Sequence, residues 1–359
     1  MNYKNLIVFF KDALRVAVKN PVQAYYFFRS LRWLKKASGI RSEWQNQGIE
    51  VPPIIIFSVT NECNLECKGC YAHFLHNTKG KELSDYKLRE IVEEARQLGV
   101  SFFVIAGGEP FKRPEMLNIM KDFPKIIFMV FTNGTLIDEN MRTSLKKNRN
   151  IIPLVSIEGD QEHTDFRRGE GTFFFLSNIM KQMKNKNLFF GNSITLTSTN
   201  FSSVMNESYI KELVDYGCKF FLFLEYTPTD ETTNDWVLSE EQRSMVAGLM
   251  EVYRNKYPAL FIGVPWDEED VGGCMSSGRG FVHINANGDL EPCPFAPYSD
   301  VNLNNTTLKE ALQSEFIKTL RNYEGLIEET GGGCVLWQNR ELVQTILNKT
   351  NENKYNKTA

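Results

Sequence analysis

The sequence predicts an α/β protein whose strands form a parallel sheet. Six apolar, β-branched segments of strand length alternate with segments of helical periodicity from residue 53 to residue 225. This alternation indicates β-α units with right-handed crossovers, arranged either as an open doubly wound sheet or as a partial barrel. In both architectures ligands bind at the carboxyl ends of the strands, so functional side chains are expected there.

The predicted strands are Pro53–Val59, Phe102–Ala106, Ile126–Phe131, Ile151–Ile157, Leu188–Thr197 and Phe220–Glu225. The helices predicted between them are Ser84–Leu98, Pro114–Phe123, Phe173–Asn185 and Val204–Tyr216. Gly99 and Gly217 follow two of these helices, where a left-handed residue commonly ends a helix. A further helical stretch, around Ser239–Tyr257, is predicted to link the sheet to the C-terminal part of the chain.

The first 42 residues carry much of the positive charge. They contain nine Lys or Arg residues and one acidic residue, Asp12, although the whole chain has a formal net charge of −3. Two helices are predicted here, one around Leu6–Val18 and one from Pro21 to Lys36. The second interleaves aromatic residues with cations, which allows two interpretations. It is either an amphipathic helix at a membrane interface or a cap that closes the bottom of the barrel.

The seven cysteines of this chain indicate metal ligation by reduced thiols. No apolar run approaches the roughly 20 residues of a membrane span. Charged residues from Lys11 to Lys19 interrupt any candidate secretory signal. We therefore expect a cytoplasmic metalloprotein, with peripheral membrane contact through residues 1–42 as a further possibility. No nucleic-acid-binding module is recognisable.

Three of the thiols, Cys63, Cys67 and Cys70, lie within eight residues, directly after the first predicted strand. A tight loop at the end of a strand directs such sulfurs to a common centre, and thiolates suit either zinc or an iron–sulfur cluster. A structural zinc site takes four ligands, and no fourth Cys or close-spaced His completes one within the loop. Three thiolates on a four-iron cluster would leave one iron open to another ligand.

This C-x3-C-x2-C loop, followed by Tyr71, resembles the loop that characterises the radical S-adenosylmethionine (SAM) superfamily. The resemblance implies a partial (β/α)6 barrel of the TIM type and a 4Fe-4S cluster held by Cys63, Cys67 and Cys70. It further implies that the open iron binds SAM. Reduction, by an external donor such as a flavodoxin or ferredoxin, then cleaves SAM to a 5′-deoxyadenosyl radical that abstracts a substrate hydrogen.

Residues at the other strand ends resemble the SAM-binding motifs of the same superfamily over roughly residues 53–228. Gly107-Gly108-Glu109-Pro110 resembles its GGEP motif, in which the glycines permit a close approach and the carboxylate binds the amino group of SAM. Glu158 stands where relatives commonly carry Asp, and Arg168 best matches an arginine that pairs with the SAM carboxylate. The predicted SAM-binding set is Tyr71, Gly107, Gly108, Glu109, Pro110, Asn133, Ser156, Glu158, Arg168 and Ser193.

A second group of cysteines lies near the C-terminus. Cys274 and Cys293 flank two alternating runs joined at Asn287-Gly288, which predict a β-hairpin with a type I′ turn. With Cys334, they resemble the SPASM domain, which holds auxiliary iron–sulfur clusters. Because the further cysteines of a full SPASM domain are absent, the resemblance is to its shortened form, Twitch, and implies a second 4Fe-4S cluster on Cys274, Cys293 and Cys334. Its fourth ligand is left open among Asp267–Asp270, a distant ligand and the substrate, and a zinc site or no metal is the alternative.

Three further residues receive structural interpretations. Cys218 is expected to be a buried structural thiol. His283 alternates with apolar neighbours and is expected at the surface or on a face of the hairpin, whereas His163 is expected to position other groups.

Five segments are expected. They are a basic helical extension (1–50), a radical SAM partial barrel (51–228), a helical linker (229–262), a Twitch-like domain (263–340) and a partly disordered tail (341–359). The expected function is radical SAM catalysis on a peptide or protein side chain or on a small molecule. The alternatives are a lipid or isoprenoid substrate at a membrane surface and a non-enzymatic iron–sulfur or zinc scaffold.

Overall fold

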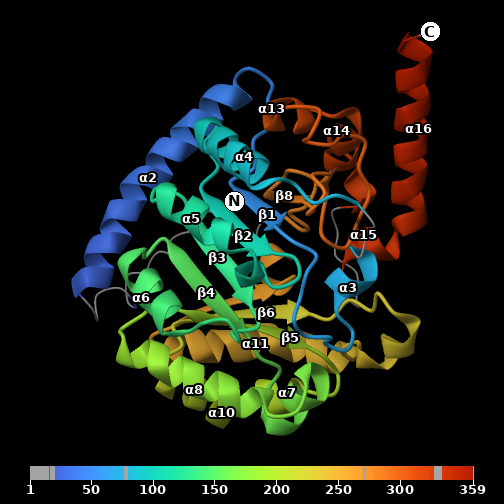
Figure 1. Cartoon of the computed structure of the whole chain (residues 1–359). Helices are drawn as coiled ribbons and strands as arrows, with labels where there is room; N and C mark the ends of the chain where they lie inside the picture. Colours follow the sequence, from blue (N-terminus) through green and yellow to red (C-terminus); the bar gives the residue numbers. More distant parts are fainter. Residues whose placement is uncertain (1–15, 17–20, 77–79, 270–271, 327–333, 359) are drawn as a thin grey trace.

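The computed structural model describes residues 16, 21–76, 80–269, 272–326 and 334–358 of the 359-residue chain. One twisted sheet organises them, with the strand order β7-β6-β5-β4-β3-β2-β1-β8-β9 (Figure 1). The six predicted strands are β1 (Ile54–Ser58), β2 (Phe102–Ala106), β3 (Ile127–Thr132), β4 (Ile151–Ser156), β5 (Gly191–Leu196) and β6 (Phe220–Glu225). Neighbours among them pair in parallel. The sheet is not closed, so the predicted α/β fold with a partial barrel is confirmed.

Helices cover the outer face of the sheet (Figure 1). They are α4 (Asp85–Leu98), α5 (Pro114–Asp122), α6 (Glu139–Lys147), α7 (Gln161–Arg168), α8 (Thr172–Asn185), α9 (Phe201–Val204), α10 (Glu207–Asp215) and α11 (Glu240–Lys256). Local chemistry fixes their ends. The Ser84 hydroxyl accepts from Lys87 N at the start of α4, and Gly99, with φ of +90°, ends it. Ser239 and Gln242 form a capping box at the start of α11.

One parallel strand of the sheet, β7, was not predicted. Strand β7 (Leu260–Val264) pairs with β6, with Phe220 opposite Leu260. It begins in the stretch predicted as a helical linker, residues 229–262. Only five residues long and containing Gly263, it gives a weak strand pattern directly after the strong helical pattern of α11.

The C-terminal hairpin belongs to the same sheet. Strand β8 (Phe281–Ile284) pairs in parallel with β1, and β9 (Leu290–Glu291) pairs antiparallel with β8. The hairpin is therefore confirmed, but its turn is not type I′. Five residues separate the strands, and the Asn285 side chain accepts from the backbone N–H groups of Asn287 and Asp289, both at 3.0 Å. Short helices follow the hairpin: α13 (Leu308–Ala311), α14 (Glu315–Arg321) and α15 (Val335–Gln338).

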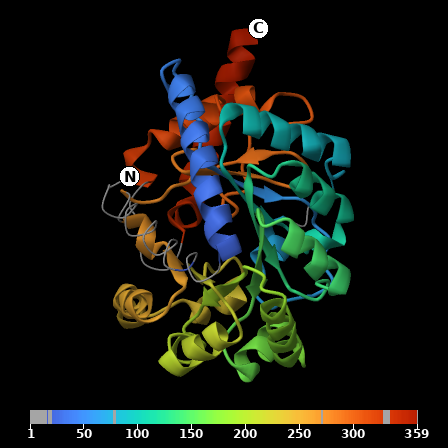
Figure 2. The same ribbon diagram turned by 90° about the vertical axis from the view of Figure 1, so that its left-hand side faces the viewer.

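Helix α2 (Pro21–Gln45) starts at the predicted residue and crosses the side of the molecule that faces the viewer in Figure 2. Phe27 packs into the apolar cluster on the inner face of the strands, which also contains Val16. The Arg41 guanidinium donates to Ser101 Oγ (2.9 Å), just before β2, and Arg149, just before β4, donates to Gln23 (3.1 Å). These contacts at the amino ends of the strands agree with a capping role. The helix predicted around Leu6–Val18 lies outside the described residues except for Val16.

The last helix, α16 (Arg340–Thr358), occupies the stretch predicted as a partly disordered tail, and it extends away from the barrel in Figure 1. Within the described part of the chain, no helix is both long enough and apolar enough to span a bilayer.

Candidate active site

The three-cysteine loop runs from the carboxyl end of β1 to α3 (Tyr71–Leu75). All three thiols are free. Cys63 is exposed, and Cys67 and Cys70 are partly exposed. The carboxyl end of α7 holds the middle of the loop, because Lys68 N donates to Arg167 O (3.0 Å) and Arg167 Nε donates back to Lys68 O (3.2 Å). The loop is therefore anchored to the far side of the barrel mouth.

Gly107 and Gly108 bring the end of β2 against the segment that leads into the loop. Gly108 N donates to Thr60 O at 2.7 Å, and Glu109 N donates to Glu62 O at 2.8 Å. A Cβ on Gly108 would lie 2.1 Å from Glu62 O, and a Cβ on Gly107 would lie 2.3 Å from Thr60 O. The close approach that these glycines permit is thus to the backbone of the cysteine segment, where an approach to a ligand was expected.

We expect Gly108→Ala to lower both stability and iron content, because the new methyl group would displace backbone rather than a flexible side chain. The expected loss of unfolding free energy is about 1–3 kcal/mol. Gly248→Ala in α11 is the matched control, since its Cβ would meet nothing within 4 Å and alanine is the better helix former. Iron analysis and thermal unfolding of both variants test the expectation. If Gly108→Ala keeps the iron content and the stability of the unmodified protein, as the control should, the expectation is wrong.

Glu109 joins the ends of β2 and β3. Its side chain is only 1% exposed, and it accepts from Thr132 Oγ1 (2.8 Å) and from Asn133 N (2.7 Å). Burial raises the pKa of Glu109, and these hydrogen bonds oppose the rise. Asn133 in turn places its amide nitrogen 3.9 Å from Cys63 Sγ. The predicted GGEP carboxylate and the end of β3 therefore converge on the first cysteine.

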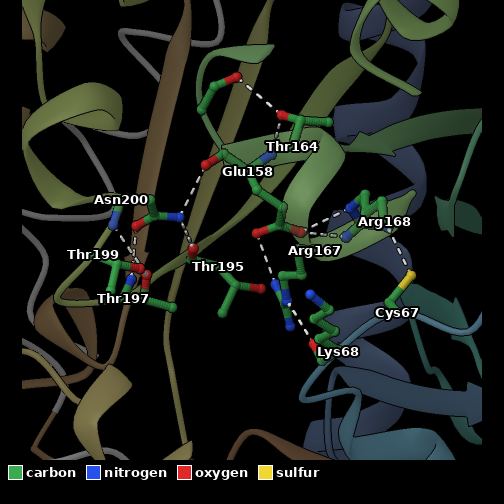
Figure 3. Close-up of polar contacts among 11 residues, drawn as sticks. Cys67, Lys68, Glu158, Thr164, Arg167, Arg168, Thr195, Thr197, Thr199 and Asn200 are labelled. Atoms are coloured by element: carbon green, nitrogen blue, oxygen red, sulfur yellow. Dashed lines mark hydrogen bonds and ion pairs between the residues drawn. The ribbon is translucent and has the colours of Figure 1, made fainter. Parts of the chain in front are cut away.

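A buried ion-pair group connects the end of β4 to the second cysteine (Figure 3). Arg168 Nε donates to Glu158 Oε1 at 2.8 Å, and Arg167 Nη1 lies 2.7 Å from Glu158 Oε2. The Glu158 side chain is 2% exposed and both arginines are nearly as buried. Arg168 Nη1 also lies 4.0 Å from Cys67 Sγ. The sequence assigns Glu158 and Arg168 separate contacts to SAM, whereas here the two side chains bind each other.

The remaining predicted SAM-binding residues lie around the same edge of the sheet. Ser156 and Ser193 are opposite each other in the β4–β5 register, and Ser193 is buried. Pro110 is buried at the start of a short 3-10 turn. The Tyr71 ring packs 5.0 Å from that of Phe295, beside the second cysteine group, and burial raises the pKa of Tyr71.

The second group of cysteines comes together in the C-terminal region. Cys274 and Cys293 are buried, Cys334 is partly exposed, and all three belong to one apolar cluster with Phe281. The pKa of Cys293 is raised, chiefly by a hydrogen bond with Cys334 and next by burial. The charge of a Cys274 thiolate raises it further. Of the proposed carboxylate ligands, Asp267 is paired with Arg254 at 2.7 Å, and Asp270 lies outside the described residues.

Two of the three structural interpretations agree fully with the geometry. Cys218 is fully buried, and burial raises its pKa to about 12. His163 Nδ1 lies 2.7 Å from Asp160 Oδ1, and His163 Nε2 lies 3.0 Å from Thr199 O, which suits a positioning role. His283 is not at the surface, because β8 lies inside the sheet and the side chain is 0% exposed; it lies on a face of the hairpin, the other position expected for it.

His283 also contributes to a group that sequence reasoning missed. His76, His283 and Glu291 lie together in the protein interior, although they are far apart in sequence. The predicted hairpin gave only a partial signal, because His283 and Glu291 lie opposite each other across the observed five-residue turn and not across the predicted type I′ turn. Nothing in the sequence links His76 to them, because that link depends on where α3 ends.

The residues of the cysteine loop fit a thiolate-held cluster. One loop presents all three thiols, and each is at least partly exposed. The Asn133 amide approaches Cys63 Sγ, and the Arg168 guanidinium approaches Cys67 Sγ. Burial raises the pKa of the Cys67 thiol, and the charge of Arg168 opposes that rise. The buried carboxylate of Glu109 and the polar ends of β4 and β5 offer partners for a charged, hydroxyl-rich ligand such as SAM.

Comparison with known proteins agrees with this geometry. The model of the Radical SAM superfamily matches residues 57–205. The AdoMet-dependent heme synthase of Methanosarcina barkeri is 22% identical over 78% of this chain and 88% of its own length. The Fe-coproporphyrin III synthase of the same organism is 28% identical, over 40% of this chain and only 37% of its own length. The subtilosin biosynthesis protein AlbA of Bacillus subtilis is 23% identical over 67% of this chain and 54% of its own length.

Solved structures share the fold. Streptococcus suis SuiB bound to its precursor peptide SuiA superposes with a TM-score of 0.63 and 17% identity, covering 85% of this chain and 72% of SuiB. The anSMEcpe structure with bound AdoMet gives a TM-score of 0.58 and 18% identity, covering 83% of this chain and 99% of that one. The superfamily match spans the cysteine loop and the strand ends that surround it. The chain is therefore similar to enzymes of the radical SAM superfamily over residues 57–205, and the cofactors of that superfamily are a 4Fe-4S cluster and SAM.

Proposed function

We propose that Cys63, Cys67 and Cys70 hold the 4Fe-4S cluster and that its fourth iron binds SAM. The observation that carries this proposal is the position of the loop, which is bonded to the ends of β2 and α7 and approached by the end of β3. When bound, the two cofactors supply a 5′-deoxyadenosyl radical, formed by one-electron reduction, that abstracts a hydrogen atom from the substrate.

The protein's own residues have binding and positioning roles in this proposal. Glu109 accepts from the amino group of SAM, while Ser156 and Ser193 offer hydroxyl groups at the ends of β4 and β5. Glu158 holds the Arg168 guanidinium 4.0 Å from Cys67 Sγ. The positive charge of Arg168 therefore favours the thiolate form of Cys67. The buried ion-pair group also limits the access of water to this side of the loop.

We propose that the second group of cysteines holds an auxiliary 4Fe-4S cluster. Cys274, Cys293 and Cys334 are separated by up to 60 residues in sequence, yet they lie in one apolar cluster, where Cys334 and Cys274 both raise the pKa of Cys293. Three soft ligands in a water-poor site favour an iron–sulfur cluster. Tyr71 connects the two cysteine groups, because Cys70 precedes it and its ring packs 5.0 Å from that of Phe295, two residues after Cys293.

We infer that the substrate is the side chain of a peptide or protein. Two comparisons support this substrate class: SuiB, which shares the fold over most of this chain, was solved with a precursor peptide, and AlbA serves in the biosynthesis of a bacteriocin. Aromatic side chains stand at the surface beside the loop, where Phe166 is 55% exposed and packs 6.0 Å from Trp236. Exposed aromatic anchors of this kind are typical of surfaces that bind peptides.

The test is an anaerobic assay with dithionite, SAM and separated peptide, lipid and small-molecule fractions of the host. We expect the peptide fraction to raise the release of 5′-deoxyadenosine at least tenfold over the assay without substrate. Digestion of that fraction with a protease should remove the stimulation. Stimulation that survives digestion, or that comes from the small-molecule fraction, would contradict a peptide substrate.

One observation favours a second candidate, a lipid or isoprenoid substrate taken at a membrane. Helix α2 exposes Val22, Tyr25 and Phe28, at 53%, 67% and 52%, spaced three residues apart beside several cations. If this face binds a bilayer, Tyr25→Glu combined with Phe28→Glu will reduce co-sedimentation with phosphatidylserine vesicles several-fold. Tyr86→Glu, at a more exposed tyrosine on α4, is the control. Equal sedimentation of the two variants would reject the candidate.

A further inference from the structure

The buried group of His76, His283 and Glu291 lies between the two cysteine groups and has no part in the function proposed above. His76 ends α3, which starts directly after Cys70. Glu291 lies on β9, two residues before Cys293, and His283 lies opposite it on β8. The three side chains are 4%, 0% and 2% exposed, so they form one of the most deeply buried polar groups in the described part of the chain.

Three possible ligand atoms in this group lie close together. His283 Nδ1 lies 2.7 Å from Glu291 Oε2, and His76 Nδ1 lies 3.9 Å from the same oxygen. All three ligand atoms fall within 4.8 Å of one another. Ligand atoms of a tetrahedral zinc ion with bonds of about 2.0 Å are about 3.3 Å apart, so the observed separations fall on both sides of that value. Shifts of less than about 1 Å in the two measured separations would suit them to one cation.

The other polar atoms of these side chains are held as they are in metal sites. His76 Nε2 lies 2.7 Å from Pro294 O, which can only accept, so this nitrogen carries the hydrogen and leaves the Nδ1 lone pair of the neutral ring facing Glu291. His283 Nε2 lies 2.8 Å from Ser58 Oγ, and Asn285 Nδ2 donates to Glu291 Oε1 at 2.7 Å. Each candidate ligand therefore has a partner that fixes its orientation, as the outer shell of a metal site does.

The surroundings of the Glu291 carboxylate also suit a cation. The carboxylate is buried, and its side-chain partners are two imidazoles and the Asn285 amide. A divalent ion would pair this buried carboxylate directly.

We propose that His76, His283 and Glu291 bind a divalent transition-metal ion, zinc or ferrous iron, at a mononuclear site separate from both cysteine groups. Two imidazoles and one carboxylate form a ligand set that suits either ion. The ion would tie α3, which follows the SAM-cluster loop, to the hairpin that leads into Cys293. Its role in this position is structural, because it fixes one cysteine group relative to the other.

Metal analysis of the anaerobically purified protein tests the proposal. We expect about one equivalent of zinc, or of iron in excess over acid-labile sulfide, in addition to the cluster iron. This metal should fall at least tenfold in His76→Gln and in His283→Gln, while sulfide stays unchanged. His73→Gln is the matched control, since His73 is exposed on the same helix and should keep the full metal content.

X-ray absorption at the zinc edge, or Mössbauer spectroscopy for iron, gives a readout that needs no variant. The expected site has only nitrogen and oxygen ligands, whereas metal bound adventitiously to the cysteines would show sulfur. Sulfur ligation of the extra metal would overturn the proposal. The proposal would also be overturned if the purified protein contained no extra metal and took up none from added zinc or ferrous iron. The three side chains would then form a metal-free hydrogen-bonded group.

Discussion

Replacement of Cys67 by alanine is expected to abolish SAM cleavage and to remove four of about eight irons from the reconstituted protein. Cys67 is the central thiol of the loop, and Arg168 approaches its sulfur at 4.0 Å. Two thiolates cannot hold a four-iron cluster with one open iron, so no 5′-deoxyadenosine should form in the presence of dithionite. Iron and sulfide analysis, together with quantification of 5′-deoxyadenosine, provides the measurement.

Two other cysteine variants complete this experiment. Cys293→Ala should lose the other four irons, while the loop of Cys63, Cys67 and Cys70 keeps its cluster. Cys218→Ala should lose none, because Cys218 is fully buried and its thiol donates to a backbone carbonyl, Phe220 O. If Cys293→Ala retains all of the iron, the C-terminal cysteines hold no cluster. If Cys67→Ala still cleaves SAM, the assignment of the loop is wrong.

Replacement of Glu158 by glutamine is expected to lower the free energy of unfolding by about 3–5 kcal/mol. The carboxylate is 2% exposed and lies between Arg167 and Arg168, so its loss leaves two buried guanidinium groups without their carboxylate partner. Glutamine keeps the shape of the side chain, which makes the loss of charge the main change. Anaerobic urea denaturation measures the difference.

Glu139→Gln is the matched control for this substitution. Glu139 also pairs with two cations, Arg142 and Lys186, but its side chain is 66% exposed. Water already screens such a pair, so a much smaller loss of stability than in Glu158→Gln is expected. If the two variants lose the same free energy of unfolding, the burial of the Glu158 ion pairs does not make them more important for stability.

The sequence predicted the sheet well where a pattern repeats and poorly where position depends on a distant partner. The six predicted strands match the structure to within about three residues, because buried parallel strands give continuous apolar runs. The same reasoning placed Cys63, Glu109 and Arg168 at one edge of the sheet, since the carboxyl ends of parallel strands share that edge. It failed for β7, whose five residues include a glycine.

Long-range contacts explain the other differences. The pairing of Ile54 with Phe281 buries His283, which was expected at the surface or on a face of the hairpin, and no local pattern encodes that pairing. Likewise, the contact between Glu158 and Arg168 depends on the angle at which α7 leaves β4. Spacing alone allowed each side chain to face a ligand, whereas the folded chain brings them together.

The pairing of β1 with β8 also has a consequence for the order of folding. Until Phe281 has been synthesised, β1 has β2 on one side and an unpaired edge on the other. Contacts between residues so far apart in sequence form late, because a long loop must close before they bring any gain. We therefore expect the strand that carries the cysteine loop to gain its full protection from hydrogen exchange only after most of the chain has left the ribosome. Iron that enters before that stage would meet an incomplete sheet.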